Sequence, residues 1–193
     1  MTRWLIDFDS TISATFEQQL KVVNTVFGTS YTADKSVSWN TDDYMLPEHS
    51  SYMWSDNVFF NPDFQATCEP VQGAVEGVHA LLSKGHKVFV VSDRAEKLYD
   101  GTREWLDIQG LAEVDLIFTR SPKHATVVSH GAHTKSQVAY YKRLKNVVED
   151  APHHSLALAN RRYIDKVYLL DMAYNRHIEH PKIERIYSWE DVA

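Results

Sequence analysis

The sequence has 193 residues, enough for one domain with a sizeable buried core but too few for two independent cores. With 44% hydrophobic and 24% charged residues, the composition is that of a globular protein. The net charge of −6 argues against a nucleic-acid polymer as partner, because phosphate backbones are bound by clustered Lys and Arg. We find neither a membrane-spanning run nor a secretory signal, and therefore expect a cytoplasmic protein.

The first predicted strand ends in acidic residues. A short apolar run, Trp4–Ile6, is followed by the polar stretch Asp7–Thr11. This pattern is typical of a buried strand with carboxylates at its tip. Thr15 and Gln18 then form a candidate capping box, and apolar residues recur at helical spacing, which predicts a helix over 15–27.

The next stretch, from about 29 to 70, consists of short pieces rich in Asp, Asn, Ser, Pro and aromatic residues. We interpret residues 15–70 as a small, mainly helical cap inserted after the first strand, and residues 1–14 and 71–193 as the core domain. The aromatic residues of this cap either form its own small core or provide a wall that stacks on a nucleobase. They are Trp39, Tyr44, Tyr52, Trp54, Phe59, Phe60 and Phe64.

Strand and helix patterns alternate through the rest of the chain. Repeated β-α-β units predict an α/β fold, with a mostly parallel sheet and helices on both faces. Ligands of such sheets bind at the carboxyl ends of the strands. The predicted elements are a helix over 74–82, a strand from Val88 to Ser92, a helix ended by Gly110, a strand over 115–119, a helix that begins with a Thr134/Gln137 capping box and reaches Val148, and a strand from Val167 to Asp171.

Polar residues with complementary chemistry stand at the ends of these elements. Asp7, Asp9, Ser92 and Asp171 follow predicted strands, and Lys135 begins a predicted helix. The set suits phosphoryl transfer, in which one carboxylate attacks phosphorus while a second protonates the leaving oxygen and then activates water. A divalent cation would neutralise the charge between carboxylates and phosphate. A hydroxyl and an ammonium group would bind the remaining phosphate oxygens.

These motifs resemble the four motifs of the haloacid-dehalogenase superfamily. Within it the chain looks most like the 5′(3′)-deoxyribonucleotidases, over nearly its whole length. The supporting segments are Ser36–Trp39, Phe59-Phe60, Pro70–Ala74, Lys84–His86, Arg103–Leu106, Leu169–Asp171, Tyr174-Asn175 and Ser188-Trp189. The resemblance implies a Rossmann-like, magnesium-dependent phosphatase that hydrolyses a small phosphomonoester, a (deoxy)nucleoside monophosphate, through an aspartyl-phosphate.

The resemblance also implies a role for each motif residue. Asp7 is the expected nucleophile, and Asp9 is the expected general acid and base. Phosphate would be bound by Ser92, Asp93, Arg94 and Lys135, and magnesium (Mg²⁺) by Asp7, Asp9 and Asp171.

Two positions depart from the pattern of that superfamily. Asp171 is followed by Met172, where two adjacent acids are usual, so metal binding would be weaker. Asp93 replaces a small neutral or hydroxyl residue, and an acid near phosphate is unfavourable unless Arg94 or the metal compensates it. These departures leave open a catalytically weak relative that binds a nucleotide or a protein partner.

The sequence leaves the phosphate-binding lysine and the substrate undecided. A long link over 145–166 makes Lys142 a rival to Lys135 as that lysine. The substrate could be a sugar phosphate, and the oligomeric state, including a homodimer, is left open. Three histidine pairs lack a third ligand at a suitable spacing, so we do not expect a zinc site there. They are His130 and His133, His153 and His154, and His177 and His180.

Overall fold

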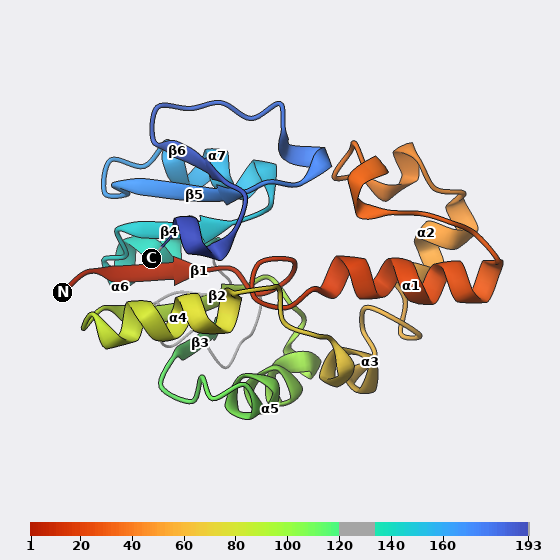
Figure 1. Cartoon of the computed structure of the whole chain (residues 1–193), viewed down its shortest axis with the longest axis horizontal. Coiled ribbons are helices and arrows are strands. Elements are labelled where there is room, and N and C mark those ends of the chain that lie inside the picture. Colours follow the sequence, from red (N-terminus) through yellow and green to blue (C-terminus); the bar gives the residue numbers. More distant parts are fainter. Residues whose placement is uncertain (120–133, 193) are drawn as a thin grey trace.

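The computed structural model describes residues 1–119 and 134–192. At its centre is a six-stranded, entirely parallel sheet in the order β3-β2-β1-β4-β5-β6 (Figure 1). The strands are β1 (Arg3–Ile6), β2 (Lys87–Ser92), β3 (Asp115–Phe118), β4 (Asn146–Glu149), β5 (Lys166–Leu170) and β6 (Ile183–Ile186). The predicted α/β fold with its parallel sheet is confirmed.

The part of the chain that the structure describes contains seven α-helices. They are α1 (Thr15–Phe27), α2 (Pro47–Met53), α3 (Pro62–Thr67), α4 (Ala74–Ser83), α5 (Tyr99–Ile108), α6 (Lys135–Lys142) and α7 (Pro152–Ala159). Within these described ranges, no helix is long and apolar enough to cross a membrane.

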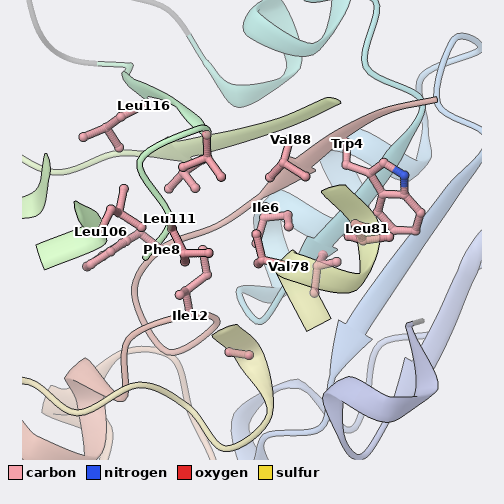
Figure 2. Packing of buried hydrophobic residues seen from close by; sticks show 14 of the residues in the cluster. Trp4, Ile6, Phe8, Ile12, Val78, Leu81, Val88, Leu106, Leu111 and Leu116 are labelled. Carbon is pink, nitrogen blue, oxygen red and sulfur yellow. The ribbon is translucent and has the colours of Figure 1, made fainter. Parts of the chain in front are cut away.

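Alternation along the strands creates two cores, one on each face of the sheet. Ile6 and Val88 face the core formed with α4 and α5, where they pack with Val78 and Leu81 (Figure 2). Leu5 belongs to the opposite core, formed with α6 and α7. Since both faces are covered, the strands are apolar along most of their length.

Helices α1 and α2 lie beyond the carboxyl ends of the strands (Figure 1). A third apolar cluster lies there, and it contains Phe16, Leu20, Val23, Met45, Met53 and Tyr174. All of these except Tyr174 come from residues 15–70. The predicted cap therefore has a small core of its own, although the proposed division into residues 15–70 and residues 1–14 with 71–193 stays a prediction.

Only one of the two predicted capping boxes forms. Thr134 and Gln137 exchange the expected hydrogen bonds at the start of α6. In contrast, α1 begins without a side-chain cap, because Thr15 Oγ1 donates to Ser13 Oγ at 3.1 Å. Thr15 is the first helical residue rather than the cap, and its hydroxyl is occupied outside the helix.

The predicted helix that contains Val148 is wrong at its C-terminal end. Arg143 adopts a left-handed conformation (φ 57°) and ends α6. The chain then becomes extended, and Val148 pairs with Ile6 of β1. Apolar residues at 144, 147 and 148 fit a helical spacing, but they belong to a strand and the turn that precedes it.

Trp189, in a short 3₁₀ helix (Trp189–Asp191), connects the end of the chain to the loop after β1. Its buried indole nitrogen donates to the carbonyl of Thr11 at 2.9 Å. The ring packs directly on Gly77 of α4, where an added Cβ would lie 2.5 Å from ring carbon Cε3. The close approach of the ring to α4 therefore depends on glycine at this position.

We predict that Gly77→Ala lowers the free energy of unfolding by about 1–3 kcal/mol, because the new methyl group overpacks the contact with Trp189. Gly101→Ala in α5 is the matched control, since nothing lies within 4 Å of its added Cβ. That variant should gain up to about 1 kcal/mol from helix propensity. Urea denaturation measures both, and equal stabilities would refute the packing argument.

Candidate active site

The loop after β1 places two carboxylates at the carboxyl end of this central strand. The amide of Asp7 donates to the carbonyl of Val148 at 3.0 Å, so the pairing with β4 continues one residue beyond β1. Ser10 then takes a left-handed conformation (φ 58°), and the carbonyl of Phe8 accepts hydrogen bonds from amides further along the loop. This turn keeps both Asp7 and Asp9 beside the same cavity.

Lys135 lies between two carboxylates. Its side chain is 3% exposed, and Nζ donates to Asp7 Oδ1 at 2.6 Å and to Glu149 Oε2 at 2.8 Å. Burial would lower the pKa of Lys135, but the charges of Asp7 and Glu149 outweigh it and raise the pKa. The buried lysine is therefore a stable ammonium group beside Asp7.

Lys142, the rival lysine, lies at the other end of α6. Its backbone carbonyl accepts from Arg3 Nη1 at 2.9 Å, next to the first residue of β1 rather than its carboxyl end. Lys142 does not line the cavity that contains Asp7. The geometry thus favours Lys135 as the lysine of the site.

Three buried carboxylates meet at the ends of β1 and β4. Ligand atoms of Asp7, Glu149 and Asp150 lie within 4.8 Å of one another, the only such group of potential metal ligands among the described residues. Burial, and then repulsion from Glu149, raises the pKa of Asp7 to about 7. Burial and the charge of Asp7 likewise raise the pKa of Asp150 to about 7.

Such crowding suits a hard divalent cation, which binds carboxylate oxygens and relieves their repulsion. Asp150 is further oriented by hydrogen bonds from the Tyr174 hydroxyl and, at 3.3 Å, from Thr11 Oγ1. The donors to Asp150 are neutral hydroxyl groups, whereas Glu149 accepts from the ammonium group of Lys135 as well as from the amide of Ala151. The donor set therefore fits magnesium, with Asp150 and Asp7 as the side chains best placed to bind it.

Asp171 has different neighbours from those expected of a metal ligand. Its carboxylate accepts from Arg185 Nη1 at 2.9 Å and from Arg176 Nη2 at 3.0 Å, and it is not part of the carboxylate group. The reason is the sheet order: β4, rather than the strand before Asp171, is the neighbour of β1. The two adjacent acids next to Asp7 are Glu149 and Asp150.

Glu149 and Asp150 are not among the site residues predicted from the sequence, although the sequence contains a signal for them. Val147 and Val148 are followed by Glu149 and Asp150, which repeats the apolar-to-acidic change at the end of β1. Pro152 then occupies the first turn of α7, a favoured position for proline. A second strand tip with carboxylates could have been read from this pattern.

Arg94 was expected to bind phosphate, but its guanidinium group pairs with Asp9. Nε lies 2.9 Å from Asp9 Oδ2, and Nη2 lies 2.6 Å from Asp9 Oδ1. Ser92 is close by, with Oγ 3.5 Å from Asp9 Oδ2 and accepting from the Arg94 amide at 3.2 Å. Asp9, Ser92 and Arg94 thus lie together beside the cavity, and the guanidinium group of Arg94 is occupied by Asp9.

Asp93 is compensated, although not by Arg94. His154 Nε2 lies 3.1 Å from Asp93 Oδ2, and Thr119 Oγ1 donates to Asp93 Oδ1. Burial would raise the pKa of Asp93, but the hydrogen bond from His154, the charge of Lys135 and the hydrogen bond from Thr119 together hold it well below its ordinary value. An ionised acid at this position is therefore stable.

A cavity of about 350 Å³ is lined both by the polar residues at the strand ends and by residues of the predicted cap. Its polar end is lined by Asp7, Asp9, Ser92, Asp93, Arg94 and Lys135, which leaves Asp171 as the one predicted site residue outside the lining. Seven aromatic side chains also line it, namely Phe16, Trp39, Tyr44, Trp54, Phe59, Phe60 and Tyr174.

The histidine pairs have separate outcomes. His153 and His154 also line the cavity, but neither belongs to a candidate metal group of the described residues. His180 accepts from the amide of Lys182 at 3.1 Å and has a local structural contact. His130 and His133 lie outside the described residues.

Solved structures share this fold. A haloacid dehalogenase-like family hydrolase from Streptococcus pneumoniae matches with a TM-score of 0.64 and 10% identity, over 100% of this chain and 96% of that one. The putative HAD-hydrolase YfnB from Bacillus subtilis, bound to magnesium, gives 0.56 and 11%, over 99% and 96%. D,D-heptose 1,7-bisphosphate phosphatase from B. bronchiseptica, complexed with magnesium and phosphate, gives 0.52 and 10%, over 98% and 94%.

The chain thus has the fold of these haloacid-dehalogenase-like hydrolases, with a group of acids at its strand tips. No curated protein matches the sequence. The family described as "5' nucleotidase, deoxy (Pyrimidine), cytosolic type C protein" matches residues 2–193, and the chain belongs to that family.

We predict that Lys135→Met lowers the free energy of unfolding by about 3–5 kcal/mol, because it leaves the buried carboxylates of Asp7 and Glu149 without their cation. Lys142→Met is the matched control on the same helix and should change stability by less than about 0.5 kcal/mol. Denaturant titrations compare the two. Similar losses in both variants would contradict the structural role of the buried ammonium group.

Proposed function

We propose that the protein is a magnesium-dependent phosphomonoesterase that hydrolyses nucleoside monophosphates through an aspartyl-phosphate on Asp7. One observation carries the proposal: Asp7 lies at the tip of the central strand, beside the ammonium group of Lys135 and the acid pair, and lines a cavity with aromatic walls. The family that the chain belongs to has a nucleotidase description, which agrees with this chemistry.

Each group has one task in the proposed reaction. An oxygen of Asp7 attacks phosphorus, the ester P–O bond breaks, and Asp9, which enters this step protonated, gives its proton to the leaving oxygen. A water molecule then attacks phosphorus and gives a proton to Asp9, and the bond between phosphorus and Asp7 breaks to release phosphate. Lys135 and Ser92 would hold non-bridging phosphate oxygens during both steps.

Magnesium would be held by the carboxylates of Asp7 and Asp150 together with the backbone carbonyl of Asp9. When bound, it supplies positive charge that offsets the carboxylates and the phosphate. Glu149 keeps Lys135 charged and in place. In this assignment Asp150 replaces Asp171, whose carboxylate is occupied by two arginines.

The alternative of a catalytically weak relative loses its two motivations. Met172 follows Asp171, which is not next to Asp7, so the missing acid there does not deplete the carboxylate group. Asp93 pairs with His154 and accepts a hydrogen bond from Thr119 rather than standing as an uncompensated charge near phosphate. Both points support an active enzyme.

The aromatic wall supports a nucleotide over a sugar phosphate. Trp39 is 44% exposed and Trp54 is 39% exposed, although both line the cavity. Partly exposed indole rings beside a phosphate site suit stacking on a nucleobase. Tyr52 packs on the cap cluster and does not line the cavity, so the two interpretations of the cap aromatics apply to different rings. A cytoplasmic location and a homodimer stay predictions.

The metal assignment is tested by comparing Asp150→Asn with Asp171→Asn. We predict that Asp150→Asn raises the magnesium concentration needed for half-maximal phosphate release by at least roughly tenfold, because a direct ligand loses its charge. It should also abolish the magnesium-induced rise in melting temperature. Asp171→Asn, on the neighbouring strand tip, should respond to magnesium like the parent.

Phosphate release from deoxy- and ribonucleoside monophosphates, followed across a magnesium titration, is the measurement. A stronger effect of Asp171→Asn than of Asp150→Asn would return the metal site to the end of β5. A parent protein that releases phosphate equally well in the presence of a chelator would refute the magnesium requirement.

The substrate assignment is tested at Trp39. We predict that Trp39→Ala lowers kcat/KM for nucleoside monophosphates by roughly 10- to 100-fold, the equivalent of about 1.4–3 kcal/mol of lost stacking. Deoxyribose 5-phosphate, which has no base, should be hydrolysed with unchanged kcat/KM. Tyr187→Ala, at an exposed aromatic outside the cavity, is the control. An equal loss on both substrates would argue against base stacking.

A further inference from the structure

The buried guanidinium group of Arg94 pairs directly with the carboxylate of Asp9, the proposed acid and base. Arg94 is 2% exposed, although arginine is rarely buried so completely. Its Nε and Nη2 atoms bind both oxygens of the Asp9 carboxylate, in the forked geometry that orients a carboxylate most strictly. Asp9 therefore cannot rotate without breaking a buried, charge-assisted pair.

Arg94 is itself fixed from several sides. Nη1 donates to Thr102 Oγ1 of α5 at 2.8 Å, and Nη2 donates to Gln65 Oε1 of α3. The guanidinium carbon lies 4.3 Å from the ring centroid of Phe8, the residue between the two acids. All three guanidinium nitrogens thus donate within the protein, which argues against a direct role of Arg94 in binding phosphate.

Asp9 keeps one accessible side. Its side chain is 25% exposed and lines the cavity, whereas the side chain of Arg94 is only 1% exposed. Because the fork fixes the plane of the carboxylate, it also fixes the direction from which Asp9 can exchange a proton with a bound group.

We propose that Arg94 is a positioning residue, which aims the carboxylate of Asp9 at the leaving oxygen and is held in place by Thr102 and Gln65. The inference rests on the proposed function and adds to it, because the geometry assigns Arg94 a role in proton delivery rather than in phosphate binding. Gln65 belongs to α3, so the orientation of the Asp9 carboxylate also depends on the packing of the predicted cap.

Leaving-group dependence tests the inference. Phenyl phosphate needs protonation of its leaving oxygen, whereas the p-nitrophenolate of p-nitrophenyl phosphate leaves with little help. Arg94→Lys keeps the charge but loses the fork. It should lower kcat for phenyl phosphate roughly 10- to 100-fold and kcat for p-nitrophenyl phosphate less than about threefold.

Two further variants separate positioning from stability. Thr102→Val removes one acceptor of Arg94 with little change in shape and should shift the ratio of the two rates in the same direction, by a smaller factor. It also covers the case in which Arg94→Lys does not fold. Arg103→Lys in α5 is the control, because Arg103 binds Asp107 and the carbonyls of Val114 and Leu111. Its rate ratio should equal that of the parent.

The double variant completes the test. Asp9→Asn should show the same selective loss on phenyl phosphate, and adding Arg94→Lys to it should cause no further selective loss, because both changes act on one proton transfer. Equal losses on both esters, or additive losses in the double variant, would overturn the positioning role while the phosphatase assignment stands. A parent protein inactive on both esters would overturn the proposed function and this inference together.

Discussion

The ammonium group of Lys135 is the interaction on which the site depends. It lies buried between Asp7 and Glu149 and thereby joins three elements, the central strand β1, its neighbour β4 and the start of α6. Without a cation, three carboxylates crowded at two strand tips would repel one another in a medium that screens charge poorly. The parallel sheet brings the tips together, and the lysine makes their proximity tolerable.

A second ion pair gives the two acids of β1 different surroundings. Asp7 faces Lys135 and the other buried carboxylates, whereas Asp9 is held by Arg94. Identical side chains, two positions apart, thus have separate environments, one among buried acids and a lysine and the other against a guanidinium group. Gln65 of α3 accepts a hydrogen bond from Arg94 of this second pair, and other residues of the predicted cap give the cavity its aromatic walls.

Much of the site could be predicted, because ligands of a parallel sheet bind at the carboxyl ends of its strands. The apolar runs before Asp7 and Ser92 mark two such strand ends in the sequence. The position of Asp150 could not be predicted in the same way. Leu144, Val147 and Val148 fit a helix as well as a strand, and only the left-handed turn at Arg143 decides between them. The order of strands in the sheet also cannot be inferred from a local sequence pattern. The predicted metal ligand Asp171 follows β5, which is not a neighbour of β1. Nor does spacing reveal that Arg94 points toward Asp9.

Identification of the covalent intermediate is the most direct test of Asp7 as the nucleophile. Acid quenching during turnover of a nucleoside monophosphate with magnesium, followed by peptide mass spectrometry, should detect one phosphoryl group on Asp7. The same experiment on Asp7→Asn should detect none. A phosphoryl group on another residue, or full turnover by Asp7→Asn, would contradict the assignment of Asp7 as the nucleophile.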